Sequence, residues 1–371
     1  MILAALLVCI VLGLFLPQYL ITRFGYRNLT YSLAFSEDEV TEGDTVTLIE
    51  TISNNKLLPL PWVKADLTTD ASLLFATDQT AVSGDARFIY SYFCLFPRRK
   101  VERRWRVTCT KRGCFTVSHA VIVLSDLFGN AECSRLFADI SAALTVLPAV
   151  RRSDAAQAFP LQLTGEVIRN RTLIPDRFAV CGIRPYTDGD SVRDVCWSAT
   201  ARADTPMVRQ YQETAVPSLT VLLNLETRET DRDQLTDKAA FEQAVRVCAA
   251  VLGEAARQHV PVRLCANTVI DTQPAETPFR SGDPALYGML RLLAALPDTI
   301  SFRCETMLDY ACTKESISSV ILITPQPTAA ILRYADAEPR LTVISARPLR
   351  DSEIRRNVRH ISIYQERIPK T

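Results

Sequence analysis

The chain has 371 residues, of which 48% are hydrophobic and 22% are charged, and its 42 basic side chains nearly balance 41 acidic ones. This composition excludes an intrinsically disordered chain and a nucleic-acid binder that relies on overall positive charge. The length is too great for one ordinary core and indicates two domains, with a third possible.

The N-terminal segment is almost entirely apolar. Residues 1–16 carry no charge, Pro17 and Gln18 interrupt the run, and Arg23 and Arg27 follow it. A bilayer-spanning helix needs about 20 apolar residues, so we expect residues 1–22 to be a transmembrane anchor. Because the positive flank is C-terminal, we expect a single-pass protein of the cell membrane with its bulk in the cytoplasm. A signal peptide and a buried core helix are the alternatives.

Residues 28–150 have the pattern of a β domain. The segment 45–53 alternates β-branched or apolar residues with polar ones, as a half-buried strand does. Similar short runs recur at 87–93, 104–109, 114–117, 120–124 and 143–147. Six or seven short strands without a helical stretch predict an immunoglobulin-like sandwich.

A basic cluster lies within this β domain, between residues 98 and 106. Given a membrane anchor, part of it is a candidate contact with anionic lipid: Arg98, Arg99, Lys100, Arg103 and Arg104. Phosphate binding with Trp105 stacked on a base is a second interpretation. The third, which we favour, is an alternating strand whose outward residues happen to be basic. We expect no nucleic-acid partner.

The second half of the chain has a different pattern. Residues 151–216 are expected to contain a linker, and residues 217–371 alternate between strand and helix patterns. Continuous apolar runs at 219–224, 319–324 and 341–345 are typical of strands buried in a parallel sheet. The segment 237–258 has helical spacing of apolar residues, and Asp283-Pro284 is a typical helix start. We therefore expect 217–371 to be a doubly wound α/β domain.

The segment 184–213 places arginines and aspartates around one tryptophan at fixed spacing. Its defining positions are Arg184, Tyr186, Gly189, Asp190, Arg193, Trp197, Ala201 and Arg202. This pattern resembles the signature of the DUF58 family, membrane-associated bacterial proteins of unassigned activity. The stretches 111–115 (Lys-Arg-Gly-Cys-Phe) and 126–129 (Asp-Leu-Phe-Gly) also resemble motifs of that family's β domain.

The resemblance implies a layout and a partner. In that layout, hydrophobic N-terminal segments precede a β domain and a C-terminal domain similar to von Willebrand factor A, expected here at 217–371. The family often has a pair of such hydrophobic segments, whereas one is visible here. DUF58-like proteins are often associated with AAA+ ATPases of the MoxR type, which implies a role in assembly.

The resemblance also raises the question of a metal. A metal-binding domain of the von Willebrand type carries Asp-x-Ser-x-Ser after its first strand, where carboxylate and hydroxyl oxygens hold a hard cation. The corresponding positions here are Asn224, Glu226 and Arg228. Asparagine removes a charge, and arginine places a cation where a ligand should be. We interpret this as a degenerate metal site and expect no metal and no cofactor.

Three interpretations of the signature stay open. In the first, which we favour, Asp190 caps a short helix, Trp197 and Val195 are buried, and arginines bridge the turn to the aspartates, so that the segment braces the connection to the sheet. In the second, three arginines bind an anionic ligand or partner: Arg184, Arg193 and Arg202. In the third, Asp188 or Asp190 acts as an acid or base.

Together these patterns favour a membrane-anchored, non-enzymatic interaction or scaffold protein that assists a MoxR-type AAA+ ATPase in protein assembly or maturation. An enzyme that acts on an anionic substrate through residues 184–202 is the alternative, and a metal-dependent adhesion module is disfavoured. The expected contact residues are Arg184, Tyr186, Asp188, Gly189, Asp190, Arg193, Trp197 and Arg202.

Overall fold

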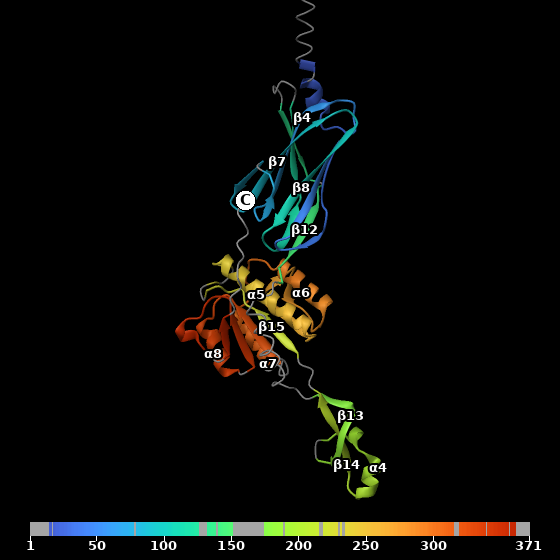
Figure 1. Cartoon of the computed structure of the whole chain (residues 1–371), viewed down its shortest axis with the longest axis vertical. Helices are drawn as coiled ribbons and strands as arrows, with labels where there is room; N and C mark the ends of the chain where they lie inside the picture. Colours follow the sequence, from blue (N-terminus) through green and yellow to red (C-terminus); the bar gives the residue numbers. More distant parts are fainter. Residues whose placement is uncertain are drawn as a thin grey trace, which may run out of the picture. The chain divides into compact units, whose positions relative to one another are not determined.

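The computed structural model describes residues 15–16, 18–77, 79–125, 132–138, 140–150, 174–187, 190–214, 218–228, 231, 234–314, 319–338, 340–355 and 357–360. Its internal contacts divide the chain into two compact units (Figure 1). The first comprises Met1–Ala149 with Leu290–Leu296, and the second comprises Val150–Met289 with Pro297–Thr371. The four domain ranges expected from the sequence stay a prediction.

The N-terminal apolar segment is described only in part. Residues 1–14 and 17, most of the predicted anchor 1–22, lie outside the described residues. Residues 18–24 form a short helix, and Ile21 packs into the β core of the first unit.

Across the described ranges, no helix is long and apolar enough to span a bilayer. The prediction of a single-pass protein of the cell membrane is therefore wrong. The apolar character that indicated a lipid-facing helix is used, at Ile21, for packing against protein.

The first unit is built of strands in two larger sheets and one small sheet. The four-stranded sheet has the order β1 (Leu29–Phe35), β3 (Thr45–Asn54), β8 (Arg99–Cys109), β5 (Leu73–Phe75). The five-stranded sheet has the order β11 (Glu132–Phe137), β10 (Ala120–Ser125), β4 (Leu60–Asp70), β7 (Ala86–Leu95), β6 (Thr80–Ser83). In the small sheet, β12 (Ala142–Leu147) lies between β2 (Glu39–Thr41) and β9 (Gly113–Val117).

Side chains of these strands alternate between core and solvent, as the period-two sequence pattern requires. In β3 the buried positions are Val46, Leu48, Glu50 and Ile52. The Glu50 carboxylate accepts hydrogen bonds from three neutral donors: Tyr31 Oη at 2.7 Å, Ser91 Oγ at 2.7 Å and Trp105 Nε1 at 3.0 Å. Because Ser91 belongs to the five-stranded sheet and Tyr31 to the four-stranded one, the Glu50 cluster joins the two sheets through the core.

The second unit contains a two-stranded hairpin of β13 (Ile174–Pro185) and β14 (Met207–Thr214), with the 3-10 turn η1 (Val192–Asp194) and helix α4 (Trp197–Ala203) between them. It also contains a six-stranded sheet in the order β17 (Gln273–Glu276), β16 (Val262–Ile270), β15 (Leu219–Leu223), β18 (Ser319–Thr324), β19 (Leu341–Ser345), β20 (Val358–His360). Strands β16, β15, β18, β19 and β20 run parallel to one another, and the edge strand β17 is antiparallel to β16.

Helices cover both faces of this sheet. Helix α7 (Cys304–Lys314) and helix α8 (Ala329–Ala337) share a buried cluster with Leu222, Leu322 and Val343. Helix α5 (Lys238–Arg257) contributes nothing to that cluster and contacts β15, β16 and β18, so it packs on the opposite face. Every residue of β15 and β18 is buried in consequence. The remaining described elements are α6 (Asp283–Ala295) and the 3-10 turn η2 (Asp351–Glu353).

The fold class expected from the sequence, with a transmembrane helix and a C-terminal von Willebrand factor A domain, is wrong. Strand predominates over helix in the described chain, the N-terminal helix is short, and a hairpin occupies part of the expected linker. The six-stranded sheet with its antiparallel edge does not identify a von Willebrand domain. The physical reason is that a continuous apolar run predicts a strand buried on both faces, and such strands occur in many unrelated folds.

Candidate functional site

The signature residues lie on the β13–β14 hairpin, which closes its own turn through charged side chains. The Arg184 guanidinium binds the Asp190 carboxylate as a fork, with Nη1–Oδ2 and Nη2–Oδ1 distances of 2.7 Å. The backbone N–H and the hydroxyl of Thr187 both donate to the same carboxylate at 2.9 Å. The Tyr186 hydroxyl donates to the Asp190 carbonyl at 3.1 Å. We call this set the Arg184–Asp190 fork.

The fork keeps both of its charged groups ionised. The hydrogen bond from Arg184, with those from Thr187, holds the pKa of Asp190 well below its usual range. The hydrogen bond to Asp190 in turn raises the pKa of Arg184. A carboxylate with so low a pKa is a weak proton acceptor near neutral pH. The arrangement therefore suits a structural role, in which the ion pair holds the turn closed, better than acid–base chemistry.

The first interpretation of the signature, in which the segment braces the connection to the sheet, is wrong in two details. Asp190 does not cap the short helix, because its oxygens are taken by Arg184 and Thr187. Ser191 caps it instead, and its hydroxyl accepts from the Arg193 N–H at 3.4 Å. Trp197 is not buried but 69% exposed. It begins helix α4, and the buried positions beside it are taken by Cys196 and Val208.

The structure brings together only part of the predicted set. Arg193 and Arg202 are exposed, and within the described residues no side-chain contact joins either to the fork. Asp188 and Gly189 lie outside the described residues. The hairpin exposes large apolar side chains instead, which we call the hairpin apolar set: Val180, Ile183, Val192 and Trp197. Strand β14 pairs with β13.

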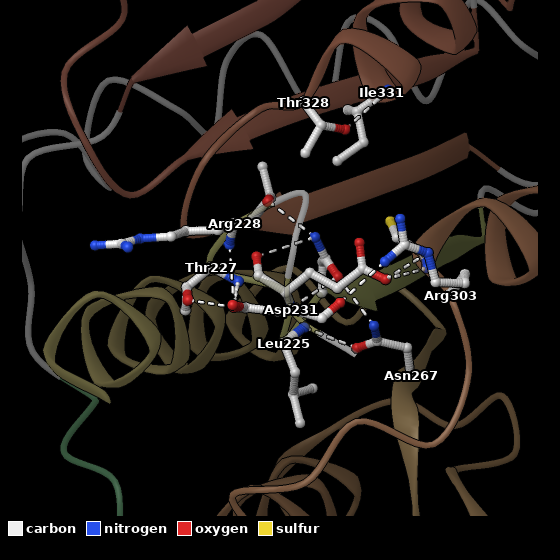
Figure 2. Close-up of polar contacts among 12 residues, drawn as sticks. Leu225, Thr227, Arg228, Asp231, Asn267, Arg303, Thr328 and Ile331 are labelled. Atoms are coloured by element: carbon white, nitrogen blue, oxygen red, sulfur yellow. Dashed lines mark hydrogen bonds and ion pairs between the residues drawn. The ribbon is translucent and has the colours of Figure 1, made fainter. Parts of the chain in front are cut away.

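A second candidate site lies at the carboxyl ends of the parallel strands β15, β16 and β18, where open α/β sheets bind ligands. Asn224 follows β15, and its amide nitrogen donates to Thr324 Oγ1 at 3.1 Å. Asn267 Nδ2 donates to Asn224 Oδ1 at 3.0 Å, and Asn267 Oδ1 accepts from the Leu225 N–H at 2.7 Å. These bonds link the three strand ends through a buried polar network, drawn in Figure 2.

Two buried carboxylates complete this network. Asp231 accepts hydrogen bonds from four donors: the N–H groups of Thr227 at 2.9 Å and Arg228 at 3.1 Å, and the hydroxyls of Thr227 and Thr236. Glu226 Oε1 accepts from the Cys304 N–H at 3.1 Å and lies 3.6 Å from Arg303 Nε. Arg303 also donates through Nη1 to the Asp231 carbonyl at 3.0 Å.

The two carboxylates differ in their electrostatics. Burial raises the pKa of Glu226, and the Cys304 N–H and Arg303 offset this only in part. Burial acts in the same direction on Asp231, but the hydrogen bonds from Thr227 and Thr236 outweigh it and lower the pKa of that carboxyl. Hydrogen bonds from the protein therefore outweigh the cost of burying the Asp231 charge, whereas they offset the cost of burying the Glu226 charge only in part.

The network differs from the predicted degenerate metal site at one position. Asn224 and Glu226 take part, but the Arg228 side chain is exposed and points away from the others in Figure 2, so that only its backbone contributes. The cation beside the carboxylates is Arg303, at the start of α7. Among the described residues, no group of three or more His, Cys, Asp or Glu side chains is placed to hold a metal ion.

Sequence reasoning missed Thr227, Asp231, Asn267 and Arg303. Asn267 had a usable signal, since it is a polar residue directly after the apolar run of β16, as Asn224 is after β15. Asp231 and Arg303 lie in loops, and nothing in their local sequence shows that the chain brings them beside Glu226.

The basic cluster is divided by the alternation of β8. Lys100, Arg104 and Arg106 are exposed, whereas Arg103 points to the inward side and lies over the rings of Phe93 and Trp105. The candidate lipid contact of Arg98, Arg99, Lys100, Arg103 and Arg104 is therefore not one surface. Trp105 is buried and donates its indole N–H to Glu50, so it is unavailable for stacking on a base.

Comparison with known proteins finds one family model that matches part of the chain. The family model described as "Protein of unknown function DUF58" matches residues 182–343, which include the fork, the hairpin apolar set from Ile183 onward and the buried polar network. The resemblance predicted from the signature is confirmed over this range. The match supports neither the membrane association nor the von Willebrand domain expected with it. No curated protein matches the chain.

Several solved structures are similar to part of the chain. A non-cellulosomal cohesin from Archaeoglobus fulgidus is 13% identical, with a TM-score of 0.23, and the match covers 35% of this chain and 98% of the cohesin. A CARDB domain from Pyrococcus furiosus is 11% identical, with a TM-score of 0.23, covering 33% of this chain and 94% of that domain. The sporulation control protein Spo0M from Bacillus subtilis is 13% identical, with a TM-score of 0.19, covering 43% and 58%. Scores this low carry no argument about function.

Proposed function

We propose that this chain is a non-enzymatic interaction protein whose hairpin contacts a protein partner. The observation that carries the proposal is that the polar and the apolar residues of the signature are placed differently. The polar residues Arg184 and Asp190 bind each other inside the hairpin, while the nearby apolar residues Val192 and Trp197 are 67% and 69% exposed. Exposed tryptophan is enriched in protein interfaces and often contributes most of the binding energy.

The partner we propose is an AAA+ ATPase of the MoxR type, which this chain would assist in protein assembly or maturation. The support for this partner is the DUF58 match at 182–343 together with the partner that the resemblance implies. The fork has a defined part in this function. By fixing the turn, it reduces the conformational freedom that the hairpin would lose on binding.

Trp197→Ala tests this proposal. The full chain is immobilised and its binding to a purified MoxR-type ATPase from the same genome is measured with and without nucleotide. We expect the wild type to bind and Trp197→Ala to weaken binding by about tenfold or more, as for a central interface tryptophan. The matched control is Trp62→Ala, which removes another exposed tryptophan, 56% against 69%, from β4.

Three results would contradict the proposal. The first is a wild-type chain that binds no such ATPase, and the second is a Trp197→Ala variant that binds as well as the wild type. A loss of binding in Trp62→Ala equal to that in Trp197→Ala would place the contact outside the hairpin, which also contradicts it.

A further inference from the structure

The outward face of the four-stranded sheet in the first unit carries a row of cations along its strand β8. The alternation of that strand leaves Lys100, Arg104 and Arg106 exposed together with Glu102, while Trp105 and Val107 face the core. One ion pair lies within the row, between Arg104 Nη2 and Glu102 Oε1 at 2.9 Å. Three cations therefore stand against one carboxylate. We call this surface the β8 basic face.

The neighbouring strand does not neutralise this charge. In the pairing of β3 with β8, Lys100 lies opposite Ser53, Arg104 opposite Ile49 and Arg106 opposite Thr47. Cross-strand neighbours on one face stabilise a sheet when their charges are opposite, and none of these three pairs does so.

The strand beyond β3 has no charge on this face either. The outward residues of β1 are Thr30, Ser32 and Ala34, which pair with Ser53, Thr51 and Ile49 of β3. In the described part of the chain, Lys100 and Arg106 make no ion pair. The face thus presents unpaired cations beside a flat surface of small hydroxyl side chains.

We propose that the β8 basic face binds an acidic segment of a partner polypeptide. Guanidinium and ammonium groups recognise carboxylates, and the adjacent serine and threonine hydroxyls can donate further hydrogen bonds to the same oxygens. Along a strand, alternate residues repeat about every 7 Å, so Arg104 and Arg106 are spaced like every second side chain of an extended peptide. A segment with acidic residues at alternate positions matches this spacing.

The chemistry of the face favours a polypeptide over a nucleic acid. Single-stranded nucleic acids are held by aromatic side chains on which bases stack, in addition to cations. The outward residues of β1, β3 and β8 include no aromatic ring.

The test uses the full chain and a fluorescein-labelled Glu–Ser repeat peptide, with binding followed by fluorescence anisotropy at several NaCl concentrations. The variant is Lys100→Gln/Arg104→Gln/Arg106→Gln, and all three side chains are exposed, so the fold is retained. We expect it to bind about tenfold more weakly than the wild type at low salt. We also expect wild-type binding to weaken as NaCl is added.

A matched control removes the same charge elsewhere. Arg23→Gln/Lys111→Gln/Arg333→Gln replaces three exposed cations outside the β8 basic face, and it is expected to bind the peptide within about twofold of the wild type. Equal loss in the two triple variants would show an effect of net charge alone and would overturn the proposal.

Two further results would also overturn it: a peptide affinity that salt does not change, and tighter binding of oligo-dT than of the peptide. The outcome is independent of the hairpin, since Trp197→Ala is expected to leave peptide binding unchanged. Failure of this proposal is therefore distinguishable from failure of the proposed function.

Discussion

The hairpin and the buried polar network use the same kinds of residue in opposite ways. In the hairpin, the ion pair between Arg184 and Asp190 lies at the surface, and the large apolar side chains are exposed. In the network, Asp231 and Glu226 are buried and are held mostly by neutral donors. In the hairpin, the polar groups fix the shape of the turn and large apolar side chains stay exposed. In the buried polar network, the polar groups join the ends of three strands.

The contrast is tested most strongly by Asp231→Ala. This change leaves the Thr227 N–H, the Arg228 N–H and the Thr236 hydroxyl without their acceptor inside the protein. We expect the free energy of unfolding of the second unit to fall by about 3 kcal/mol, measured by urea denaturation.

Asp298→Ala is the control for Asp231→Ala. It breaks the surface ion pair with Lys238 and is expected to cost less than about 1 kcal/mol. Equal losses in the two variants would show that the network contributes no more than a surface pair.

Asp190→Asn should act on the hairpin alone. The fork loses its charge, so we expect the amide of Thr187 to exchange with solvent much faster while the six-stranded sheet keeps its protection, as measured by hydrogen exchange. Because the folded-state pKa of Asp190 is lowered, the stability that this carboxylate contributes is present above the ordinary aspartate pKa and is lost as pH falls through the folded-state value. Wild-type protection of Thr187 that is already lost near pH 6 would contradict this.

Glu226→Gln sharpens the contrast inside the network. The pKa of Glu226 is raised, so its contribution to stability is present below the ordinary glutamate pKa and is lost as pH rises through the folded-state value. Glutamine does not ionise, so we expect the unfolding free energy of the variant to rise relative to that of the wild type between low and neutral pH. Urea denaturation at several pH values measures this, and a difference that stays constant with pH would show that Glu226 does not titrate there.

Trp197→Ala should have the smallest effect on stability. Its side chain is exposed, so we expect the free energy of unfolding to change by less than about 0.5 kcal/mol in the same denaturation assay. A larger loss would mean that Trp197 packs against the protein. The hairpin would then resemble the first interpretation of the signature, in which Trp197 is buried.

Sequence patterns located individual elements better than they identified the fold. The apolar runs at 219–224, 319–324 and 341–345 coincide with β15, β18 and β19, because a strand buried on both faces must be apolar throughout. The von Willebrand domain that the family resemblance implied was wrong, and these runs could not test it, because burial does not distinguish between folds. The apolar start of the chain indicated a membrane helix, also wrongly, since its length alone does not show whether lipid or protein covers it.

The candidate sites were predictable only where the chemistry is local. The Arg184–Asp190 fork lies within one turn, and the signature indicated that arginines bridge this turn to aspartates, although it assigned Asp190 to a helix cap. The exposure of Trp197 was not predictable, since it depends on what the rest of the chain covers. The partnership of Glu226 with Arg303 joins positions far apart in sequence, and only the parallel order of β15, β16 and β18 brings such loops together.

The Glu50 cluster has a consequence for how the first unit assembles. A shift of β3 by a single position in its pairing would turn Glu50 to the outside. The buried donors of Tyr31, Ser91 and Trp105 would then have no acceptor. The same shift would turn Val46, Leu48 and Ile52 to the outside as well, so the apolar side chains and the buried carboxylate favour the same alignment. Glu50 therefore adds a cost of unpaired buried donors to the cost of exposing apolar side chains, and both costs act against a shifted pairing of β3.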